Sequence, residues 1–288
     1  MARRTSMLSV LSLSALTGAG CKARNMDKIS VYREEDYEHL DFIAYGMYGV
    51  VSKVKNRETE EVYALKTLRP EKSEHGATEA SALEQLDHKN IVRMIATSSE
   101  DGFFYTVLEY IQADLEGASS DKENIPKIKE KEAEILFRVL EGIAYIHSKS
   151  LVHRDLKLSN ILVDLETMAV KICDFGACID GKKSFYMDNS FYGKDLSDAA
   201  KLMRHLLPPS AKETHGRMVP ENNVEHLDDE TFFYFKNKED LLQRMCFPED
   251  INAHTAAELL KHPFFADVRR LDGSGEAKKD QPGAQIKE

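Results

Sequence analysis

The chain has 288 residues, of which 42% are hydrophobic and 31% charged, and its formal net charge is −10. A chain of this length forms one large domain or two small ones, and the composition is too apolar for a disordered protein. The acidic balance argues against nucleic-acid binding as the main function, because phosphate backbones are held by clustered Lys and Arg. No apolar run is long enough to cross a bilayer as a helix.

The cysteines are few and scattered. Cys21, Cys173, Cys178 and Cys246 include no C-x-x-C pair, so neither a disulfide scaffold nor a zinc ribbon is expected. We therefore expect reduced thiols in an intracellular protein.

The two ends of the chain differ from the rest. Arg3 and Arg4 precede an apolar, serine-rich stretch, which is the outline of a secretory or mitochondrial targeting signal. The alternative is a disordered leader ahead of a second start at Met26. Residues 1–30 are thus expected to be a leader of one of these two kinds. Residues 269–288 have little to bury and are expected to form a disordered tail.

Hydrophobic periodicity predicts strands first and helices afterwards. Short β-like runs between polar turns predict strands at Phe42–Ile43, Gly49–Lys55, Val62–Thr67 and Phe103–Tyr110, with one helix near Ala77–Leu86. Apolar residues at helical spacing predict helices over Lys131–Ser148, Asp195–Leu207, Asp240–Cys246 and Thr255–Lys261. The polar stretch Gly117–Lys127 is predicted to be a loop because it contains Pro126. The fold class is therefore α+β, with a small β-rich lobe over 37–111 and a larger helical lobe over 112–268.

The first motif is a glycine-rich run. It matches the pattern G-x-G-x-x-G-x-V, with an alanine in the place of the first glycine, and its members are Ala44, Tyr45, Gly46, Met47, Tyr48, Gly49 and Val51. Glycines let a strand–turn–strand close over phosphates, because no Cβ atom blocks the backbone N–H groups. Taken alone, the run favours a plain β-hairpin.

The second motif is the apolar strand run that ends at Lys66. Its ammonium suits the α- and β-phosphates of ATP when a helical carboxylate holds it in place. Glu79 is the candidate carboxylate, and Glu84 is the competing choice. The alternative is a lysine that only extends to solvent from the strand.

The third motif, H-R-D-L-K-L-S-N at residues 153–160, follows the strongest predicted helix. Asp155 suits the role of orienting an attacking hydroxyl and accepting its proton. Lys157 offers a cation to the transferring phosphate, and Asn160 an amide oxygen to a metal ion. A charged turn at a helix end is the alternative, and six fixed positions in order argue strongly against it.

The fourth motif is Asp174-Phe175-Gly176, which follows Val170-Lys171-Ile172-Cys173 and lies fourteen residues past Asn160. Asp174 is suited to hold Mg²⁺ against the phosphates, while Phe175 packs inward and Gly176 lets the backbone turn. On its own, this tripeptide is weak evidence for a nucleotide site. Its position and spacing after the third motif make the evidence strong.

With these motifs in this order, the sequence resembles the eukaryotic protein kinases from about Tyr37 to Val268. The resemblance implies the two-lobed protein kinase fold, with ATP and Mg²⁺ in the cleft and the adenine against a hinge that contains Glu109 and Ile111. Lys157 is similar to the lysine of the serine/threonine-specific class. The expected substrates are therefore Ser and Thr hydroxyls of proteins.

Within the family, the sequence is most similar to the cyclin-dependent kinases. The similar segments are Tyr37–Leu40, Leu108–Leu115 and His262–Val268. This resemblance implies a possible cyclin-like regulatory subunit, a role in cell-cycle or transcription control, and a location in the nucleus or cytoplasm.

The segment after the fourth motif departs from the family. Residues 177–194 contain no A-P-E motif and are about half the usual length, and Ser197 stands in the place of a tryptophan. The arginine that usually pairs with the A-P-E glutamate is also missing, because its place is taken by Ala253. A lone buried charge is costly, so the joint loss is self-consistent. Ser190 is the candidate if a phosphate regulates this segment.

Two hypotheses follow. The first is an active ATP-dependent serine/threonine kinase, which the intact set of chemical residues supports. The second is a catalytically weak pseudokinase, a nucleotide-binding module that acts as a scaffold, which the shortened segment supports. The first is favoured, because drift usually breaks at least one essential residue once catalysis is no longer needed.

Overall fold

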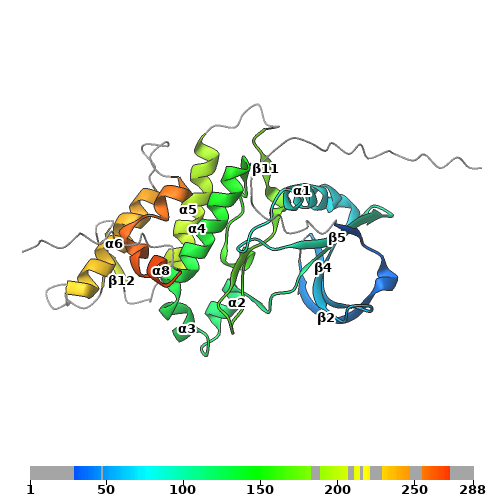
Figure 1. Ribbon diagram of the computed structural model, residues 1–288, viewed down its shortest axis with the longest axis horizontal. Coiled ribbons are helices and arrows are strands. Elements are labelled where there is room, and N and C mark those ends of the chain that lie inside the picture. The colour runs from blue at the N-terminus through cyan, green and yellow to red at the C-terminus, as the bar shows by residue number, and fades with distance from the viewer. Residues whose placement is uncertain are drawn as a thin grey trace, which may run out of the picture.

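The computed structural model describes residues 29–46, 48–182, 189–206, 211–214, 217–220, 229–246 and 255–272. They form a β-rich lobe at one end of the molecule and a helical lobe at the other (Figure 1). The predicted two-lobed α+β fold is confirmed. The predicted leader up to residue 28 and the predicted tail from residue 273 lie outside the described residues.

The small lobe is built on a six-stranded sheet with the order β1-β5-β6-β4-β3-β2. Its strands are β1 (Ser30–Val31), β2 (Tyr37–Tyr45), β3 (Gly49–Asn56), β4 (Val62–Leu68), β5 (Met94–Glu100) and β6 (Phe103–Glu109). Neighbours pair antiparallel, except that β1 pairs parallel with β5. Val54, Leu65 and Val107 form the centre of its core. Strands β1 and β5 were not predicted, because two residues are too few for a pattern and β5 turns polar after Ala96.

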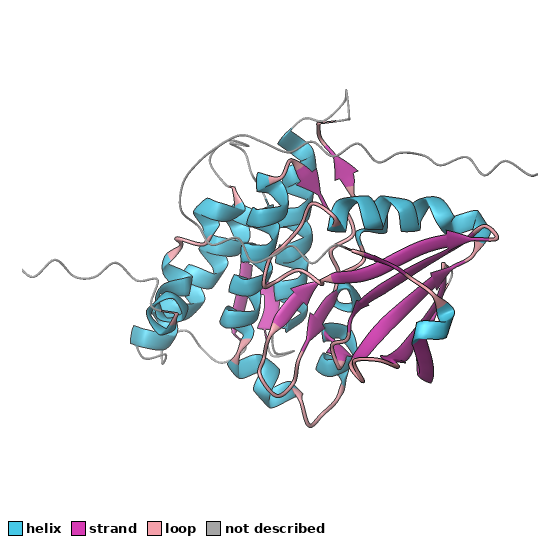
Figure 2. Cartoon of the chain, turned by 45° about the vertical axis from the view of Figure 1, so that its right-hand side comes forward, coloured by secondary structure: helices cyan, strands magenta, loops and turns pink. Residues whose placement is uncertain are grey.

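Helix α1 (Ser73–Leu83) lies along this sheet (Figure 2). It follows a 3₁₀ turn, η2 (Pro70–Lys72), and therefore begins before the predicted start at Ala77. The approach to β6 is close at Gly76, where an added Cβ would lie 2.4 Å from the ring of Phe104. A glycine at this position lets the helix reach the sheet, because no side chain stands between them.

The large lobe is organised around one central helix. Its helices are α2 (Leu115–Ser120), α3 (Ile125–Glu130), α4 (Glu132–Ser148), α5 (Asn189–Leu206), α6 (Asp229–Cys246), α7 (Ala256–Leu259) and α8 (Ala266–Leu271). Helix α4 packs against α5, α7 and the strand β10 described below. Leu140, Ile143 and Ile146 on its inner face are fully buried, which is the apolar face that the sequence periodicity predicted.

The prediction of a loop over Gly117–Lys127 is wrong, because most of this stretch belongs to α2 and α3. Asp114 caps α2 by accepting a hydrogen bond from the backbone N–H of Gly117 at 2.9 Å. Pro126 lies in the first turn of α3, where a missing N–H group costs nothing. Proline therefore marks the beginning of a helix here.

Helices α5 and α6 also differ from the prediction, since both begin well before the expected starts at Asp195 and Asp240. Only residues 177–188 therefore separate Gly176 from the first residue of α5. The segment between Gly176 and this helix is therefore shorter in the structure than the segment 177–194 that the sequence predicted.

Short strands carry the two later motifs to the junction of the lobes. They are β7 (Ala113–Asp114), β8 (Leu151–Val152), β9 (Ile161–Val163), β10 (Val170–Ile172) and β11 (Ile179–Asp180), and a separate hairpin is formed by β12 (Ala211–Thr214) and β13 (Arg217–Pro220). The order β10-β9-β7 forms one small sheet, and β11 pairs with β8. Residues 153–160 join β8 to β9 and end in η3 (Leu158–Asn160), while Asp174 follows β10 and precedes η4 (Phe175–Ala177).

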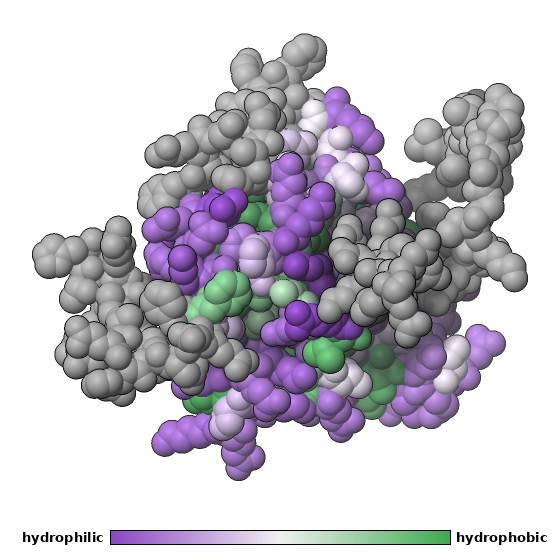
Figure 3. All heavy atoms as spheres, turned by 60° about the vertical axis from the view of Figure 1, so that its left-hand side comes forward, coloured by the Kyte–Doolittle hydropathy of each residue, from purple (hydrophilic) through white to green (hydrophobic). Residues whose placement is uncertain are grey.

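The face in Figure 3 is largely hydrophilic, and its apolar residues gather in small patches. Across the described ranges, no helix has the length and apolar character required to span a membrane.

Candidate active site

Lys66, on β4 of the small lobe, contacts one carboxylate from each lobe. Its Nζ lies 2.8 Å from Oε2 of Glu79 on α1 and 2.8 Å from Oδ1 of Asp174 after β10. Glu79 is fully buried, so of the two predicted carboxylates it is the one that holds the lysine. Glu84, the competing choice, is exposed at the C-terminal end of α1.

The electrostatics of this trio keep Lys66 and Asp174 charged. Burial lowers the pKa of Lys66, but the carboxylates of Glu79 and Asp174 more than offset this, so its pKa lies above the ordinary value. Burial likewise raises the pKa of Asp174, but the charge and hydrogen bond of Lys66 outweigh it and the pKa lies below the ordinary value. The ammonium is therefore a fixed positive charge in the cleft.

The third motif brings its three predicted residues together. Lys157 Nζ lies 2.8 Å from Oδ2 of Asp155, and both side chains remain partly open to solvent. Asn160 donates through Nδ2 to the backbone oxygen of Asp155 at 2.7 Å and to its carboxylate at 3.1 Å. The hydrogen bond with Asp155 raises the pKa of Lys157. An exposed carboxylate held by an amide and an ammonium can receive a proton from an entering hydroxyl.

Asp195, which is fully buried in α5, holds the backbone of the loop that carries the third motif. Its carboxylate accepts hydrogen bonds from the backbone N–H of His153 at 2.9 Å and of Arg154 at 2.8 Å, and His147 Nε2 lies 3.0 Å away. Arg154 has a left-handed backbone, with φ of 71°, which is strained for a residue with a side chain. The sequence pattern placed Asp195 at a helix start, and nothing in its spacing revealed that it holds the loop.

The fourth motif is fixed from both lobes. The backbone N–H of Phe175 donates to Oε1 of Glu79 at 3.3 Å, and the buried Phe175 ring packs edge-on against His153 with centroids 4.7 Å apart. His153 also contacts the carbonyl oxygen of Cys173 through Nε2 at 3.0 Å. Asp174 has a left-handed backbone with φ of 63°, and these contacts hold it in that conformation.

The glycine-rich run is a β2–turn–β3 hairpin that leads to the lysine. Ala44 and Tyr45 end β2, and the backbone N–H of Gly46 donates to the carbonyl of Gly49 at 3.0 Å. Val51 on β3 lies opposite Lys66 on β4. Met47 lies outside the described residues.

Of the two predicted hinge residues, Glu109 ends β6 and Ile111 follows it. The side chain of Glu109 is occupied elsewhere, because it accepts a hydrogen bond from the backbone N–H of Arg93 at 2.7 Å and pairs with Lys171 at 2.8 Å. Its backbone N–H donates to the carbonyl of Arg93 at 3.0 Å. Ile111 is partly buried between β6 and β7.

The donor set fits a nucleotide with a hard cation. Asp174 is 34% exposed, and Asn160 uses its amide nitrogen on Asp155, which leaves its oxygen for a cation. Mg²⁺ prefers oxygen ligands and is usually held by one or two carboxylates together with phosphates. The described residues contain no cluster of three or more His, Cys, Asp or Glu that could bind a metal by themselves.

Comparison with known proteins decides the family. Residues 37–193 match the protein kinase domain family. The chain belongs to the protein kinase family. A curated relative, "Cell division control protein 2 homolog 3" of Trypanosoma brucei brucei, is 34% identical over 169 residues, which are 57% of this chain and 52% of the relative. The chain thus spans about half the length of the curated relative that it matches.

The match to this family ends at residue 193, inside α5, and therefore includes residues 177–188 of the contracted region. Of the hydroxyls after the fourth motif, Ser184 and Tyr186 lie outside the described residues. Ser190 lies in the first turn of α5, and the Tyr192 ring contacts His147 edge-on with centroids 4.8 Å apart. Ala253 also lies outside the described residues.

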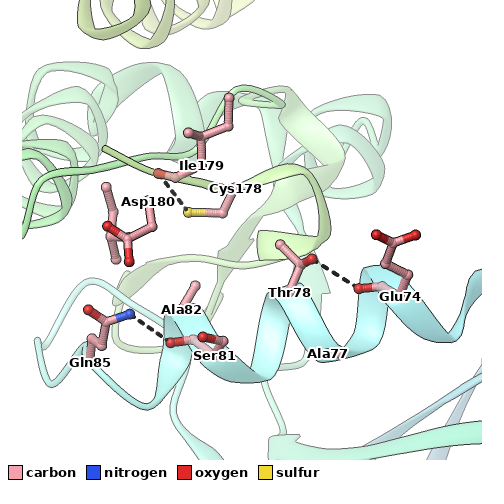
Figure 4. Close-up of a pocket in the computed structure, with 10 residues that line it drawn as sticks. Glu74, Ala77, Thr78, Ser81, Ala82, Gln85, Cys178, Ile179 and Asp180 are labelled. Atoms are coloured by element: carbon pink, nitrogen blue, oxygen red, sulfur yellow. Dashed lines mark hydrogen bonds between the residues drawn. The ribbon is translucent and has the colours of Figure 1, made fainter. Parts of the chain in front are cut away.

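The kinase also has a pocket of about 570 Å³ on the side of α1 that faces away from Lys66. Figure 4 shows Glu74, Thr78 and Gln85 of α1 on one side and the Cys178–Asp180 segment on the other. Burial raises the pKa of the Cys178 thiol to about 12, so this thiol stays protonated at neutral pH. None of the predicted catalytic residues lines this pocket.

Proposed function

We propose that this kinase is catalytically active and transfers the γ-phosphate of ATP to Ser and Thr hydroxyls of proteins, with Mg²⁺ as its metal ion. The observation that carries the proposal is the position of Lys66, held between Glu79 and Asp174 at 2.8 Å from each. A contact of this kind orients the ammonium toward the α- and β-phosphates. The exposed Asp155 then lies on the side where a substrate hydroxyl enters.

Each residue has a separate task in this proposal. Asp155 orients the attacking hydroxyl and accepts its proton, while Lys157 places a positive charge next to the transferring phosphate. Asn160 and Asp174 would hold Mg²⁺, which when bound neutralises charge on the phosphates. Asp195 keeps Asp155 in register by binding the backbone of the two preceding residues.

The test is phosphate transfer from labelled ATP by tagged protein recovered from its own cells, so that any partner is retained. Basic and proline-directed peptides serve as substrates, and Asp155→Asn is the control. Because Asp155 touches no phosphate in this proposal, the variant should bind ATP like the wild type and lose transfer by at least about 10²-fold. Transfer that survives in Asp155→Asn would contradict the assignment.

A second candidate function is a nucleotide-binding scaffold. The specific observation in its favour is the contraction after the fourth motif, where only residues 177–188 precede α5. Wild-type protein that binds ATP and Mg²⁺ but transfers no label above the control would favour this function.

We further propose a cyclin-like regulatory subunit that binds at the α1 pocket, together with a role in cell-cycle or transcription control in the nucleus or cytoplasm. The pocket supports the binding mode, because a protein seated there would bear on the helix that carries Glu79. Ala77 is exposed at its wall, so Ala77→Arg should release the subunit and lower the activity of the complex. The exposed Glu116 on α2 supplies a control, Glu116→Arg, which should retain the subunit.

A further inference from the structure

His75 lies on the inner face of α1, one helical turn before Glu79. Its Nδ1 contacts the carbonyl oxygen of Gly176 at 3.2 Å, across 101 positions of sequence. A carbonyl oxygen only accepts hydrogen bonds, so Nδ1 carries the proton and donates it. Helix α1 therefore holds the fourth motif at two points, through Glu79 to the N–H of Phe175 and through His75 to the carbonyl of Gly176.

The same histidine ring contacts the glycine-rich turn. Tyr48 meets His75 edge-on, with ring centroids 5.2 Å apart and an interplanar angle of 83°. Lys72, which precedes α1, places its ammonium 5.2 Å from the centre of the Tyr48 ring. Tyr48 is 41% exposed. Its contacts with His75 and Lys72 therefore tie the Tyr48 side of the turn to the start of α1.

These contacts join three parts of the proposed nucleotide site. They are the glycine-rich turn, helix α1 with the Glu79 that contacts Lys66, and the segment that carries Asp174. Helix and segment are also closely packed, because a Cβ added to Gly176 would lie 3.5 Å from the Cβ of His75. A residue that contacts two separate parts of a site lets the ordering of one part reduce the cost of ordering the other. Such coupling typically changes an affinity by about 5–150-fold.

We propose that His75 is a positioning residue that couples the placement of Tyr48, in the glycine-rich turn, to the placement of α1 and of the Asp174–Gly176 segment. The inference rests on the nucleotide-binding function proposed above. The histidine does not touch the reacting atoms. It acts on nucleotide affinity through the two groups that it contacts.

Two half-variants separate the contacts. His75→Asn keeps a donor for Gly176 but loses the ring, whereas His75→Phe keeps a ring for Tyr48 but loses the donor. Each is combined with Tyr48→Leu, and the dissociation constant of a fluorescent ATP analogue with Mg²⁺ is measured. We expect Tyr48→Leu to weaken binding about tenfold in the wild type and in His75→Phe, and to have little further effect in His75→Asn, because the contact it removes is already absent there.

Hydrogen exchange of the nucleotide-free protein provides a second readout. His75→Asn should raise exchange of the amides in the glycine-rich turn, while His75→Phe should raise exchange around Phe175 and Gly176. A matched control is His88→Ala, which removes another histidine–tyrosine stack, that of His88 on Tyr145 with centroids 4.9 Å apart, outside the cleft. This control should lower thermal stability and leave nucleotide affinity unchanged.

Several outcomes overturn the proposal in distinguishable ways. If Tyr48→Leu weakens binding equally in all three backgrounds, or if neither half-variant changes affinity, the coupling is wrong while nucleotide binding stands. Binding without phosphate transfer overturns kinase activity and leaves the coupling intact. A wild-type protein that binds no nucleotide overturns both.

Discussion

The carboxylate of Asp195 accepts a hydrogen bond from the backbone N–H of Arg154 at 2.8 Å, although the two residues are 41 positions apart. The same carboxylate binds the N–H of His153 and contacts His147. A fully buried carboxylate is costly unless several donors surround it. Here two of the donors are backbone N–H groups of the loop that carries the third motif, so the stability of α5 and the geometry of this loop are linked.

Replacing this carboxylate should damage both stability and the loop. Asp195→Asn keeps the shape but turns an amide N–H toward one of the backbone N–H donors. We expect a loss of about 1–3 kcal/mol of unfolding free energy, the typical cost of a buried polar group without a partner. Urea unfolding at pH 7 measures it. Thermal stability equal to that of the wild type would show that the loop does not depend on this anchor.

The acid dependence of stability should change in the same variant. Burial raises the pKa of Asp195, but the hydrogen bond and charge of His147 with the other donors outweigh it, and the pKa lies below the ordinary value of 3.8. A depressed carboxyl pKa contributes stability above the ordinary value, and this contribution disappears as pH falls through the folded-state pKa. The stability difference between wild type and Asp195→Asn should therefore narrow below about pH 4. A difference in unfolding free energy that stays constant down to pH 2 would contradict this prediction.

A second buried charge pair joins α4 to α6. Lys238 is 3% exposed and contacts the carboxylate of Glu132, which also accepts from the hydroxyl of Tyr234. Lys238→Met should cost about 3–5 kcal/mol, because it leaves Glu132 largely buried without a cation. The double variant with Glu132→Leu should recover most of this loss.

Urea unfolding of the single and double variants measures this coupling. Arg270→Met provides the control, because it breaks the Arg270–Asp267 pair, whose side chains are 77% and 86% exposed. Exposed pairs contribute at most about 1 kcal/mol. If Lys238→Met costs no more than this control, the α4–α6 pair is not a stabilising contact.

The two glycines of the turn should respond differently to alanine. A Cβ on Gly49 would lie 1.9 Å from the carbonyl oxygen of Thr67, so β3 and β4 must move apart, and Gly49→Ala should lower the melting temperature. A Cβ on Gly46 meets nothing within 4 Å among the described residues. Gly46→Ala should change stability by no more than about 0.5 kcal/mol. If this variant binds ATP more weakly at unchanged stability, the phosphates approach the backbone of the turn at Gly46.

Much of the site was predictable because its residues lie in short sequence motifs. Lys66, Asp155 and Asp174 each lie in a local pattern that the reaction requires, and the structure places them around one cleft. The strand that carries Lys66 was predicted for the same reason, since alternation and turn residues are local signals. The short strands β8, β9 and β10 that flank Asp155 and Asp174 were not predicted. Glu79 was chosen over Glu84, and Glu79 is the one that contacts Lys66.

The amino-acid sequence by itself determined the order of the lobes, the apolar face of α4 and the residue types of the cleft. Only the tertiary structure decided which distant groups meet: Asp195 with the loop, His75 with Gly176, and Glu132 with Lys238. The reason is physical. Local patterns record the preferences of neighbouring residues, whereas contacts across 41 to 106 positions depend on how helices pack. The spacing of residues around either partner does not reveal that packing.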